Sequence, residues 1–270
     1  MNYRHAFHAG NAADCMKHAL LVWMLRALQR KPAPVFVLDT HAGLGRYDLM
    51  AEAERTGEWR GGIARLLGDP PAPLAEFVAL VEQVGLYPGS PALIHALLRP
   101  DDRLVCCELH PEDHAALARL FRRDAQVAVH HRDGYEALGA LLPPRQARGL
   151  VLIDPPFEQP GEFDRLLTAL QTGAARFAPA TYAAWFPIKH RSPVRAFHEA
   201  VEAAGLRDVV CAEMLLREPT DPTRLNGCGL LVRNPPWGFE DAARGILGAM
   251  LPRFETEAGH GYLVTRLTDE

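Results

Sequence analysis

The sequence has no long hydrophobic run, and no apolar stretch approaches the ~20 residues that a membrane-spanning helix needs. Its first residues, 1–5, lack the apolar segment of a secretory signal peptide. The five cysteines are odd in number and include no C-x-x-C pair, so neither a disulfide framework nor a zinc ribbon is indicated. We therefore expect a cytoplasmic protein with reduced thiols, no metal and no membrane partner.

An excess of positive charge is also missing. The chain has 29 Lys and Arg against 33 Asp and Glu, which gives a net charge of −4. Proteins that coat nucleic acid over a wide surface normally have a basic balance, so the charge disfavours that class but allows a small basic footprint around one site. The chain is rich in apolar residues: 48% of its 270 residues are hydrophobic, enough for the core of one large α/β domain.

Short apolar runs alternate with helical patterns along the chain. Strands are predicted at 35–39, 103–108, 127–131, 149–153, 181–186, 209–214 and 228–232, and helices at 12–30, 111–124, 134–142, 162–176 and 192–204. This alternation predicts a mostly parallel sheet with helices on both faces. The last two strands are separated only by a loop, so we expect them to pair as an antiparallel hairpin.

One spacing departs from this alternation. From Asp39, at the end of the first strand, to Arg103, at the start of the next, is about twice the usual βαβ spacing of roughly 30 residues. We interpret residues 46–88 as a helical subdomain inserted into a single domain that spans 1–270. The crossover helix is then expected to begin at Ser90-Pro91, with Ser90 as its N-cap.

The tetrapeptide Asp154-Pro155-Pro156-Phe157 directly follows the predicted strand 149–153. Its prolines fix φ and remove two backbone donors, so the carbonyl groups of Asp154 and Pro155 stay outside the sheet ladder. Carboxylate and carbonyl oxygens can accept the N–H groups of a planar exocyclic amine, while the ring of Phe157 stacks on the base. This pattern is typical of methyltransferases that modify amino nitrogens, although a proline-rich turn after a strand is also common on its own.

Acidic residues stand at or near the ends of four successive predicted strands: Asp39, Glu108, Asp133 and Asp154. In open parallel sheets, ligands bind outside the carboxyl ends of the strands, so these carboxylates are expected at one edge of the sheet. Such a concentration of like charges would be repulsive unless a ligand makes use of it.

The loop 40–45 follows the first strand and contains Gly43 in a Gly-x-Gly sequence, which lets the backbone approach a ligand closely. It lacks the third glycine of the dinucleotide fingerprint. Glu108 can accept from both hydroxyls of a ribose, and Asp133 from an adenine amino group. An adenosyl ligand without a pyrophosphate is S-adenosylmethionine rather than NAD, so we expect that cofactor at this edge.

The N-terminal segment 1–11 mixes aromatic and cationic residues, and Lys17 follows on the first predicted helix. Aromatic rings stack on bases while cations meet phosphates. We therefore expect this segment to lie over the active site as a lid for nucleic acid or for the cofactor, with Tyr3, His5 and Lys17 as the candidate substrate contacts. The alternative is a frayed terminus that happens to contain several histidines.

A second sequence of the amine-methyltransferase type, Asn234-Pro235-Pro236-Trp237, follows the predicted strand 228–232. It lies outside the usual order of the motifs. We expect it to end a late strand, with Trp237 packed on the core.

Motifs at 3–11, 14, 17–18, 38–43, 87–91, 108–111, 133–134, 153–156 and 234–237 together resemble the RlmJ family of 23S ribosomal RNA adenine-N6 methyltransferases, over essentially the whole chain. The resemblance implies a Rossmann-like, class I fold that depends on S-adenosylmethionine, with a small inserted helical subdomain. It also implies a monomer without an obligate protein partner. The implied substrate is a hairpin of 23S rRNA that is free of ribosomal proteins or in an early assembly intermediate.

The same resemblance implies roles for individual residues. Asp154 would be the catalytic residue and a cofactor neighbour, Tyr3 would meet the RNA, and the cofactor contacts would be His18, His41, Ser90, Glu108, Asp133 and Gly134. One departure is Phe157, where the family often has tyrosine. Stacking survives that change, whereas a hydrogen bond from the hydroxyl does not.

Three other functions remain open from the sequence. A DNA adenine-N6 or cytosine-N4 methyltransferase would use the same acceptor groups, but it usually carries a larger basic recognition domain. A non-catalytic ribosome-assembly module would bind the cofactor without transferring the methyl group. An NAD-dependent oxidoreductase is disfavoured because the third glycine is absent.

Overall fold

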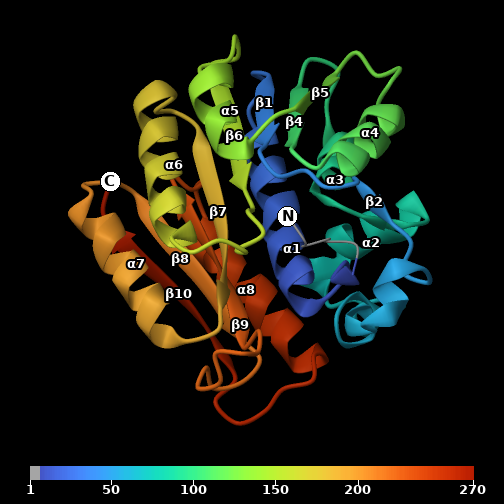
Figure 1. Cartoon of the computed structure of the whole chain (residues 1–270), viewed down its shortest axis with the longest axis vertical. Coiled ribbons are helices and arrows are strands. Elements are labelled where there is room, and N and C mark those ends of the chain that lie inside the picture. Colours follow the sequence, from blue (N-terminus) through green and yellow to red (C-terminus); the bar gives the residue numbers. More distant parts are fainter. Residues whose placement is uncertain (1–6) are drawn as a thin grey trace.

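The structure is a computed structural model and describes residues 7–270, apart from the side chain of Glu52. Within this range the chain builds an eight-stranded sheet in the order β10-β8-β9-β7-β6-β1-β4-β5 (Figure 1). The strands are β1 (Val35–Asp39), β4 (Arg103–Glu108), β5 (Val127–His131), β6 (Arg148–Ile153), β7 (Thr181–Ile188), β8 (Val209–Leu215), β9 (Gly227–Arg233) and β10 (Gly261–Thr268).

The five strands β5, β4, β1, β6 and β7 are parallel neighbours, which confirms the predicted parallel sheet. Asp39 pairs with Cys106 of β4 and with Leu152 of β6, so the carboxyl ends of these strands lie at one edge. β9 runs antiparallel to both β7 and β8, as predicted for the late hairpin. β10 was not predicted, and it pairs antiparallel with β8.

Helices cover both faces of the sheet, which confirms the predicted Rossmann-like arrangement (Figure 1). One apolar layer includes α1 (Ala12–Gln29), α2 (Ala75–Val84), α3 (Ser90–Leu97), α4 (Pro111–Leu120) and α8 (Phe239–Met250). The other includes α5 (Gly134–Leu141), α6 (Glu162–Arg176) and α7 (Arg191–Ala203). Each layer buries the apolar stripe of its helices against one face of the sheet.

α1 brings polar side chains into the centre of the molecule. Its N-cap is Asn11, whose side chain accepts a hydrogen bond from the backbone of Asp14 at 2.9 Å. The helix packs on α3 and α8, and almost every residue from Ala12 to Leu25 is buried. As a result Lys17 is only 4% exposed although it is charged, which is rare without a partner.

Between β1 and α3 the chain makes a long excursion. A two-stranded ribbon brings its ends together, because β2 (Arg46–Tyr47) pairs with β3 (Tyr87–Pro88). Four short 3-10 helices and α2 lie between the two strands: η2 (Glu52–Arg55), η3 (Glu58–Gly61), η4 (Ile63–Arg65) and η5 (Ala72–Leu74). Gly10 just before α1 accepts a hydrogen bond from the backbone of Ile63 at 2.8 Å, so the excursion contacts the N-terminal segment.

Several predicted boundaries were wrong. The N-cap of α3 is Gly89, and Ser90 is the first residue of the helix instead of its cap. α4 ends at Leu120 because the chain then turns into 121–124 before β5.

No helix in residues 7–270 is long and apolar enough to cross a membrane.

Candidate active site

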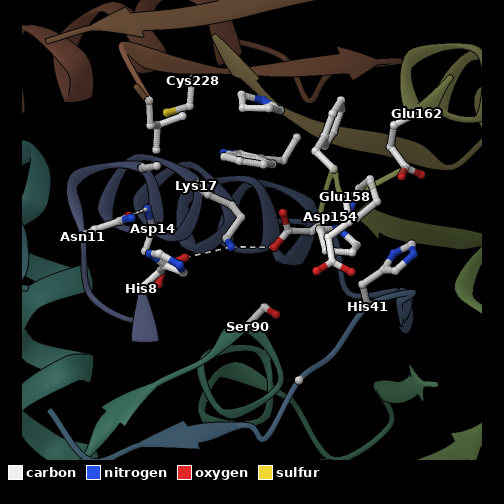
Figure 2. A pocket seen from close by; sticks show the side chains of 18 of the residues that line it. His8, Asn11, Asp14, Lys17, His41, Ser90, Asp154, Glu158, Glu162 and Cys228 are labelled. Atoms are coloured by element: carbon white, nitrogen blue, oxygen red, sulfur yellow. Dashed lines mark hydrogen bonds and ion pairs between the residues drawn. The ribbon is translucent and has the colours of Figure 1, made fainter. Parts of the chain in front are cut away.

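A cavity of about 1000 Å³ opens at the carboxyl ends of the parallel strands. Figure 2 shows side chains from α1, from the loops after β1 and β6, and from the start of α3 gathered around it. The predicted residues that line it are Lys17, His18, His41, Gly43, Ser90, Glu108, Asp133, Gly134, Asp154, Pro155 and Phe157. Tyr3 and His5 lie outside the described residues.

Asp154 follows β6 and is held by a lysine of α1. Lys17 Nζ lies 2.5 Å from Asp154 Oδ2 and 2.9 Å from Asp14 Oδ1, as Figure 2 shows. Burial opposes a charge on Lys17, but Asp14 and Asp154 outweigh it and raise the pKa of the ammonium well above its usual value. Lys17 is therefore charged at neutral pH and fixes one oxygen of Asp154.

An aromatic wall stands beside Asp154. Phe157 adopts a positive φ of 51°, which is uncommon for a residue with a side chain and indicates a turn imposed by its surroundings. Its ring meets Phe163 edge-on at 5.1 Å and Trp185 at 6.1 Å, measured between ring centroids. Lys17 Nζ lies 5.9 Å from the centroid of the Trp185 ring. Trp185 of β7 was not predicted, because nothing in the local sequence separates it from a core aromatic.

Glu108, at the end of β4, organises the loop after β1. One carboxylate oxygen accepts from the backbone of Gly43 at 2.8 Å and the other from the backbone of His110 at 2.7 Å. Burial raises the pKa of its carboxyl above the usual value. Gly43 has a φ of 61°, a conformation that favours glycine. Each oxygen keeps a lone pair for a further donor, as a ribose reader requires.

Asp133 has a structural role that was not predicted. Its Oδ1 caps α5 by accepting from the backbone of Tyr135 at 2.8 Å and of Glu136 at 3.2 Å. Its Oδ2 lies 3.7 Å from Arg165, and this guanidinium lies 4.3 Å from the centroid of the Tyr135 ring. Asp133 is thus fixed by α5 and α6, and only Oδ2 remains to meet a ligand.

His41 lies next to Asp133 and is uncharged. Burial lowers the pKa of its imidazole to about 4, although the carboxylates of Asp154 and Asp133 act in the opposite direction. Its Nδ1 lies 2.8 Å from the hydroxyl of Thr40. Gly134 packs against the same loop, where a Cβ atom would lie 2.1 Å from the carbonyl oxygen of Thr40. Only glycine therefore allows this close approach of α5 to the loop.

The remaining predicted cofactor residues, His18 and Ser90, also line the cavity. His18 is 1% exposed, and its Nδ1 lies 2.9 Å from the hydroxyl of Tyr87. Ser90 is 5% exposed and lies at the start of α3. On the N-terminal side, Glu58 bonds Nδ1 of His8 at 2.9 Å and accepts from the amide of Asn11 at 2.9 Å. These two contacts connect the segment before α1 to the excursion between β1 and α3.

The second Pro-Pro sequence lies elsewhere. β9 runs antiparallel to β7, so Asn234 follows β9 at the edge of the sheet opposite the cavity. Its side chain donates to the carbonyls of Pro179 and Ala180 at 3.0 and 3.2 Å. Trp237 is 89% exposed, and the prediction that it packs on the core was wrong.

Comparison with known proteins identifies relatives along the whole chain. The model of the family described as "Ribosomal RNA large subunit methyltransferase D, RlmJ" matches residues 32–266. The chain is 37% identical over 280 residues to ribosomal RNA large subunit methyltransferase J of Haemophilus influenzae, covering 100% of both. It is 39% identical over 256 residues to the Escherichia coli protein of the same name, covering 92% of this chain and 91% of that protein.

Two solved structures are similar to the chain to different degrees. A crystal structure of a Legionella pneumophila protein has a TM-score of 0.87 and 31% identity, and the match covers 96% of this chain and 98% of that chain. A probable spermidine synthase from Corynebacterium glutamicum has a TM-score of 0.50 at 12% identity, covering 93% of this chain and 74% of that chain, and is similar in fold alone. The chain therefore belongs to the RlmJ family of ribosomal RNA large subunit methyltransferases.

Proposed function

We propose that the protein transfers a methyl group from S-adenosylmethionine to N6 of one adenine in 23S ribosomal RNA. The family and the names of the relatives support this activity. The observation that carries the proposal is the position of Asp154. Its carboxylate, the Pro155 carbonyl and the Phe157 ring meet at one cavity, beside a second group of acids suited to an adenosyl ligand.

The second group of acids fits the cofactor by its chemistry. Glu108 offers lone pairs to two ribose hydroxyls, and Asp133 Oδ2 offers an acceptor to an adenine amino group. His18, His41, Gly43, Ser90 and Gly134 complete the set that would hold it. Neutral His41 can donate one hydrogen bond without repelling a cation. When bound, S-adenosylmethionine supplies an electrophilic methyl group on a sulfonium.

The chain's own residues would prepare the target amine. Asp154 Oδ2 is bonded to Lys17, which leaves Oδ1 to accept one N–H of the adenine amino group. The Pro155 carbonyl would accept the other N–H, and the two bonds favour a pyramidal nitrogen whose lone pair can attack. Positioning and electrostatics do most of this work, since Asp154 need not be a strong base before transfer. The methylated ammonium is acidic and can lose its proton to Asp154 afterwards.

Aromatic rings would hold the target base once it has left its stack. Phe157 and Trp185 stand edge to face beside Asp154, and either face can replace the stacking that a flipped adenine loses. Phe157 cannot donate the hydrogen bond that a tyrosine would supply, so it would hold the base by stacking alone. We expect the gain to be about 1–3 kcal/mol for one base on one ring.

Basic side chains at the mouth of the cavity support an RNA substrate. Lys189 is exposed at the end of β7. Arg217 Nε and Arg224 Nη2 both bond Glu257 Oε1, at 2.7 and 2.8 Å, which holds them in the loop between β8 and β9. These three cations would meet phosphates that flank the target base. The hairpin as substrate, the monomeric state and the cytoplasmic location are parts of this proposal.

The two accessory segments would act at the same mouth. Residues 46–88 would form the inserted subdomain, and the segment 1–11 would lie over the active site. Contacts of Glu58 with His8 and Asn11 support a joint action of the two. Tyr3, His5 and Lys17 would then meet the substrate, as the resemblance implies.

Methyl transfer from labelled S-adenosylmethionine tests the proposal. The substrates are protein-free large-subunit rRNA, intact large subunits and duplex DNA, each digested to nucleosides after reaction. We expect label in N6-methyladenosine from the protein-free rRNA. Label in DNA alone would instead support a DNA amino-methyltransferase. Cofactor binding without transfer to any of the three substrates would favour a non-catalytic assembly module.

A further inference from the structure

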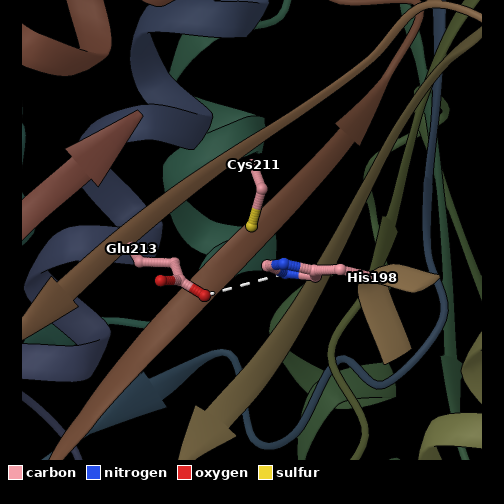
Figure 3. A group of neighbouring side chains, drawn as sticks. All are labelled: His198, Cys211 and Glu213. Atoms are coloured by element: carbon pink, nitrogen blue, oxygen red, sulfur yellow. Dashed lines mark ion pairs between the residues drawn. The ribbon is translucent and has the colours of Figure 1, made fainter. Parts of the chain in front are cut away.

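Three potential metal ligands meet on the face of β8 that points away from the active cavity. Cys211 and Glu213 are two residues apart on this strand, so their side chains point to the same face, whereas Met214 points to the other face and lines the cavity. His198 of α7 reaches the same place, as Figure 3 shows. The Sγ atom of Cys211, a ring nitrogen of His198 and a carboxylate oxygen of Glu213 lie within 4.8 Å of one another.

The separation between the histidine and the glutamate does not fit a direct bond. His198 Nε2 lies 3.7 Å from Glu213 Oε1, which is too long for a hydrogen bond. Both atoms are buried, and neither has a hydrogen-bond partner among the described residues. Two ligands of one tetrahedral ion, each ~2.0 Å from it, would lie about 3.3 Å apart. A small contraction would therefore bring both atoms to a shared ion.

The surroundings leave these atoms free to bind. Arg191 Nη1 lies 2.5 Å from Glu213 Oε2, so the buried carboxylate, 3% exposed, is oriented with Oε1 toward His198. A cavity of about 290 Å³ adjoins the three side chains and is also lined by Val194, Arg195, Leu263 and Thr265.

We propose that His198 Nε2, Cys211 Sγ and Glu213 Oε1 form a binding site for a divalent transition metal of the zinc type. A thiolate, an imidazole and a carboxylate are the ligands that Zn²⁺ takes, and water from the adjoining cavity would fill the fourth position. Binding would release the thiol proton of Cys211 to solvent, since the thiolate is the ligand. A sulfur and a nitrogen ligand disfavour Mg²⁺ and Ca²⁺, which prefer oxygen.

The site would join α7 to β8 and is independent of the methyl transfer. Because His198 and the two strand residues come from different elements, one ion would cross-link them. Arg191 and Arg195 carry like charge beside the ion and would weaken its binding relative to a site without them. The expected consequence is a metal-dependent rise in thermal stability without a change in the transfer reaction.

Titration with Co²⁺ as a spectroscopic substitute for Zn²⁺ tests the site. The purified full chain is stripped with chelator and titrated with Co²⁺, followed by competition with Zn²⁺. We expect one equivalent to give a thiolate-to-cobalt charge-transfer band that Zn²⁺ abolishes. Cys211→Ala should remove the band, and His198→Gln should weaken binding at least ~10-fold, since even changes outside the ligands cost 10–100-fold.

Cys106→Ala is the matched control, because it also removes a buried strand thiol but belongs to no such cluster among the described residues. It should keep the band and the affinity. The absence of saturable binding in the unmutated protein would overturn the proposal, as would equal affinity in the Cys211→Ala and Cys106→Ala proteins. Methyl transfer by each variant reports folding, and His198→Gln, at a partly exposed position, provides the test if Cys211→Ala fails to fold.

Discussion

Lys17 Nζ lies 2.5 Å from Asp154 Oδ2, an ion pair between the first helix and the end of a strand 137 residues later. The same ammonium also bonds Asp14 Oδ1, at 2.9 Å. The side chains of Lys17 and Asp14, both on α1, are nearly fully buried. A buried charge pair of this kind rarely increases stability over an apolar pair, but it fixes geometry. We infer that its role is to aim the free oxygen of Asp154 at the target amine.

Replacing Lys17 by methionine tests this role. The change keeps much of the side-chain volume but leaves Asp14 and Asp154 facing each other without a cation. We expect kcat to fall about 100-fold, because a misplacement of about 1 Å at the reacting centre has that effect. Cofactor affinity should change by no more than a few-fold in calorimetry. The control is Arg26→Met on the same helix, where the side chain is 46% exposed; equal turnover by both variants would contradict the role of Lys17.

Glu108→Gln should weaken cofactor binding. The change keeps the shape of the side chain and removes the negative charge, which accepts from the backbone of Gly43 and which we propose accepts from the ribose. Hydrogen bonds to charged groups contribute about 1.5–3 kcal/mol, so the dissociation constant should rise on the order of 10- to 100-fold. Isothermal titration with S-adenosylmethionine measures it. Glu136→Gln, on the exposed first turn of α5, should bind as the unmutated protein does, and an unaltered affinity in Glu108→Gln would rule out the ribose assignment.

The two Pro-Pro-aromatic sequences provide a matched pair for the stacking role. Phe157→Ala should lower kcat/KM for rRNA on the order of 10-fold or more, since one base on one ring contributes about 1–3 kcal/mol. Phe157→Tyr should stay close to the unmutated value. Trp237→Ala removes an aromatic ring at the opposite edge of the sheet and should leave the transfer unaffected. Steady-state kinetics measures kcat/KM for each variant. An equal loss of kcat/KM in Phe157→Ala and Trp237→Ala would refute the stacking role of Phe157.

The buried carboxyl of Asp39 is expected to make the stability of the fold depend on pH. Burial raises the pKa of its carboxyl to about 7, well above the unfolded value. Below about pH 3 the group is protonated in both states. As the pH rises toward 7 the unfolded chain loses its proton while the folded chain keeps it, so the free energy of unfolding falls by up to about 4 kcal/mol.

Asp39→Asn removes this titration and should flatten the profile. Urea unfolding at pH 5 and pH 8 measures the difference for each protein, with Asp48→Asn as an exposed control. The control should keep the dependence of the unmutated chain. A profile of Asp39→Asn as steep as that of Asp48→Asn would mean that another group is responsible.

Much of the fold could be predicted because its signals are local. The strands 103–108 and 127–131 match the structure residue for residue, since each is a short run whose start and end are clear in the sequence. The cavity followed from topology: parallel strands share an edge, so acids at their ends meet. Glu108 and Asp154 therefore came together although 46 positions separate them in the sequence.

Other features depend on contacts that no local pattern encodes. Trp185 became part of the active cavity only because β7 pairs beside β6. Only Val264 of β10 is buried, so this strand lacks the buried apolar run by which the other strands were found. Trp237 looked like a core aromatic, yet antiparallel pairing of β9 sends its motif to the far edge. Whether a Pro-Pro motif reaches the cavity is decided by strand direction.

Asp154→Ala tests the central claim most directly. Lys17 keeps Asp14 as a partner in this variant, so folding and the cofactor side of the cavity should survive. The measurement is label in N6-methyladenosine from protein-free large-subunit rRNA, with cofactor affinity determined on the same preparation. We predict no detectable transfer and a dissociation constant within a few-fold of the unmutated protein. Turnover close to that of the unmutated protein would contradict the assignment of Asp154 as the catalytic residue.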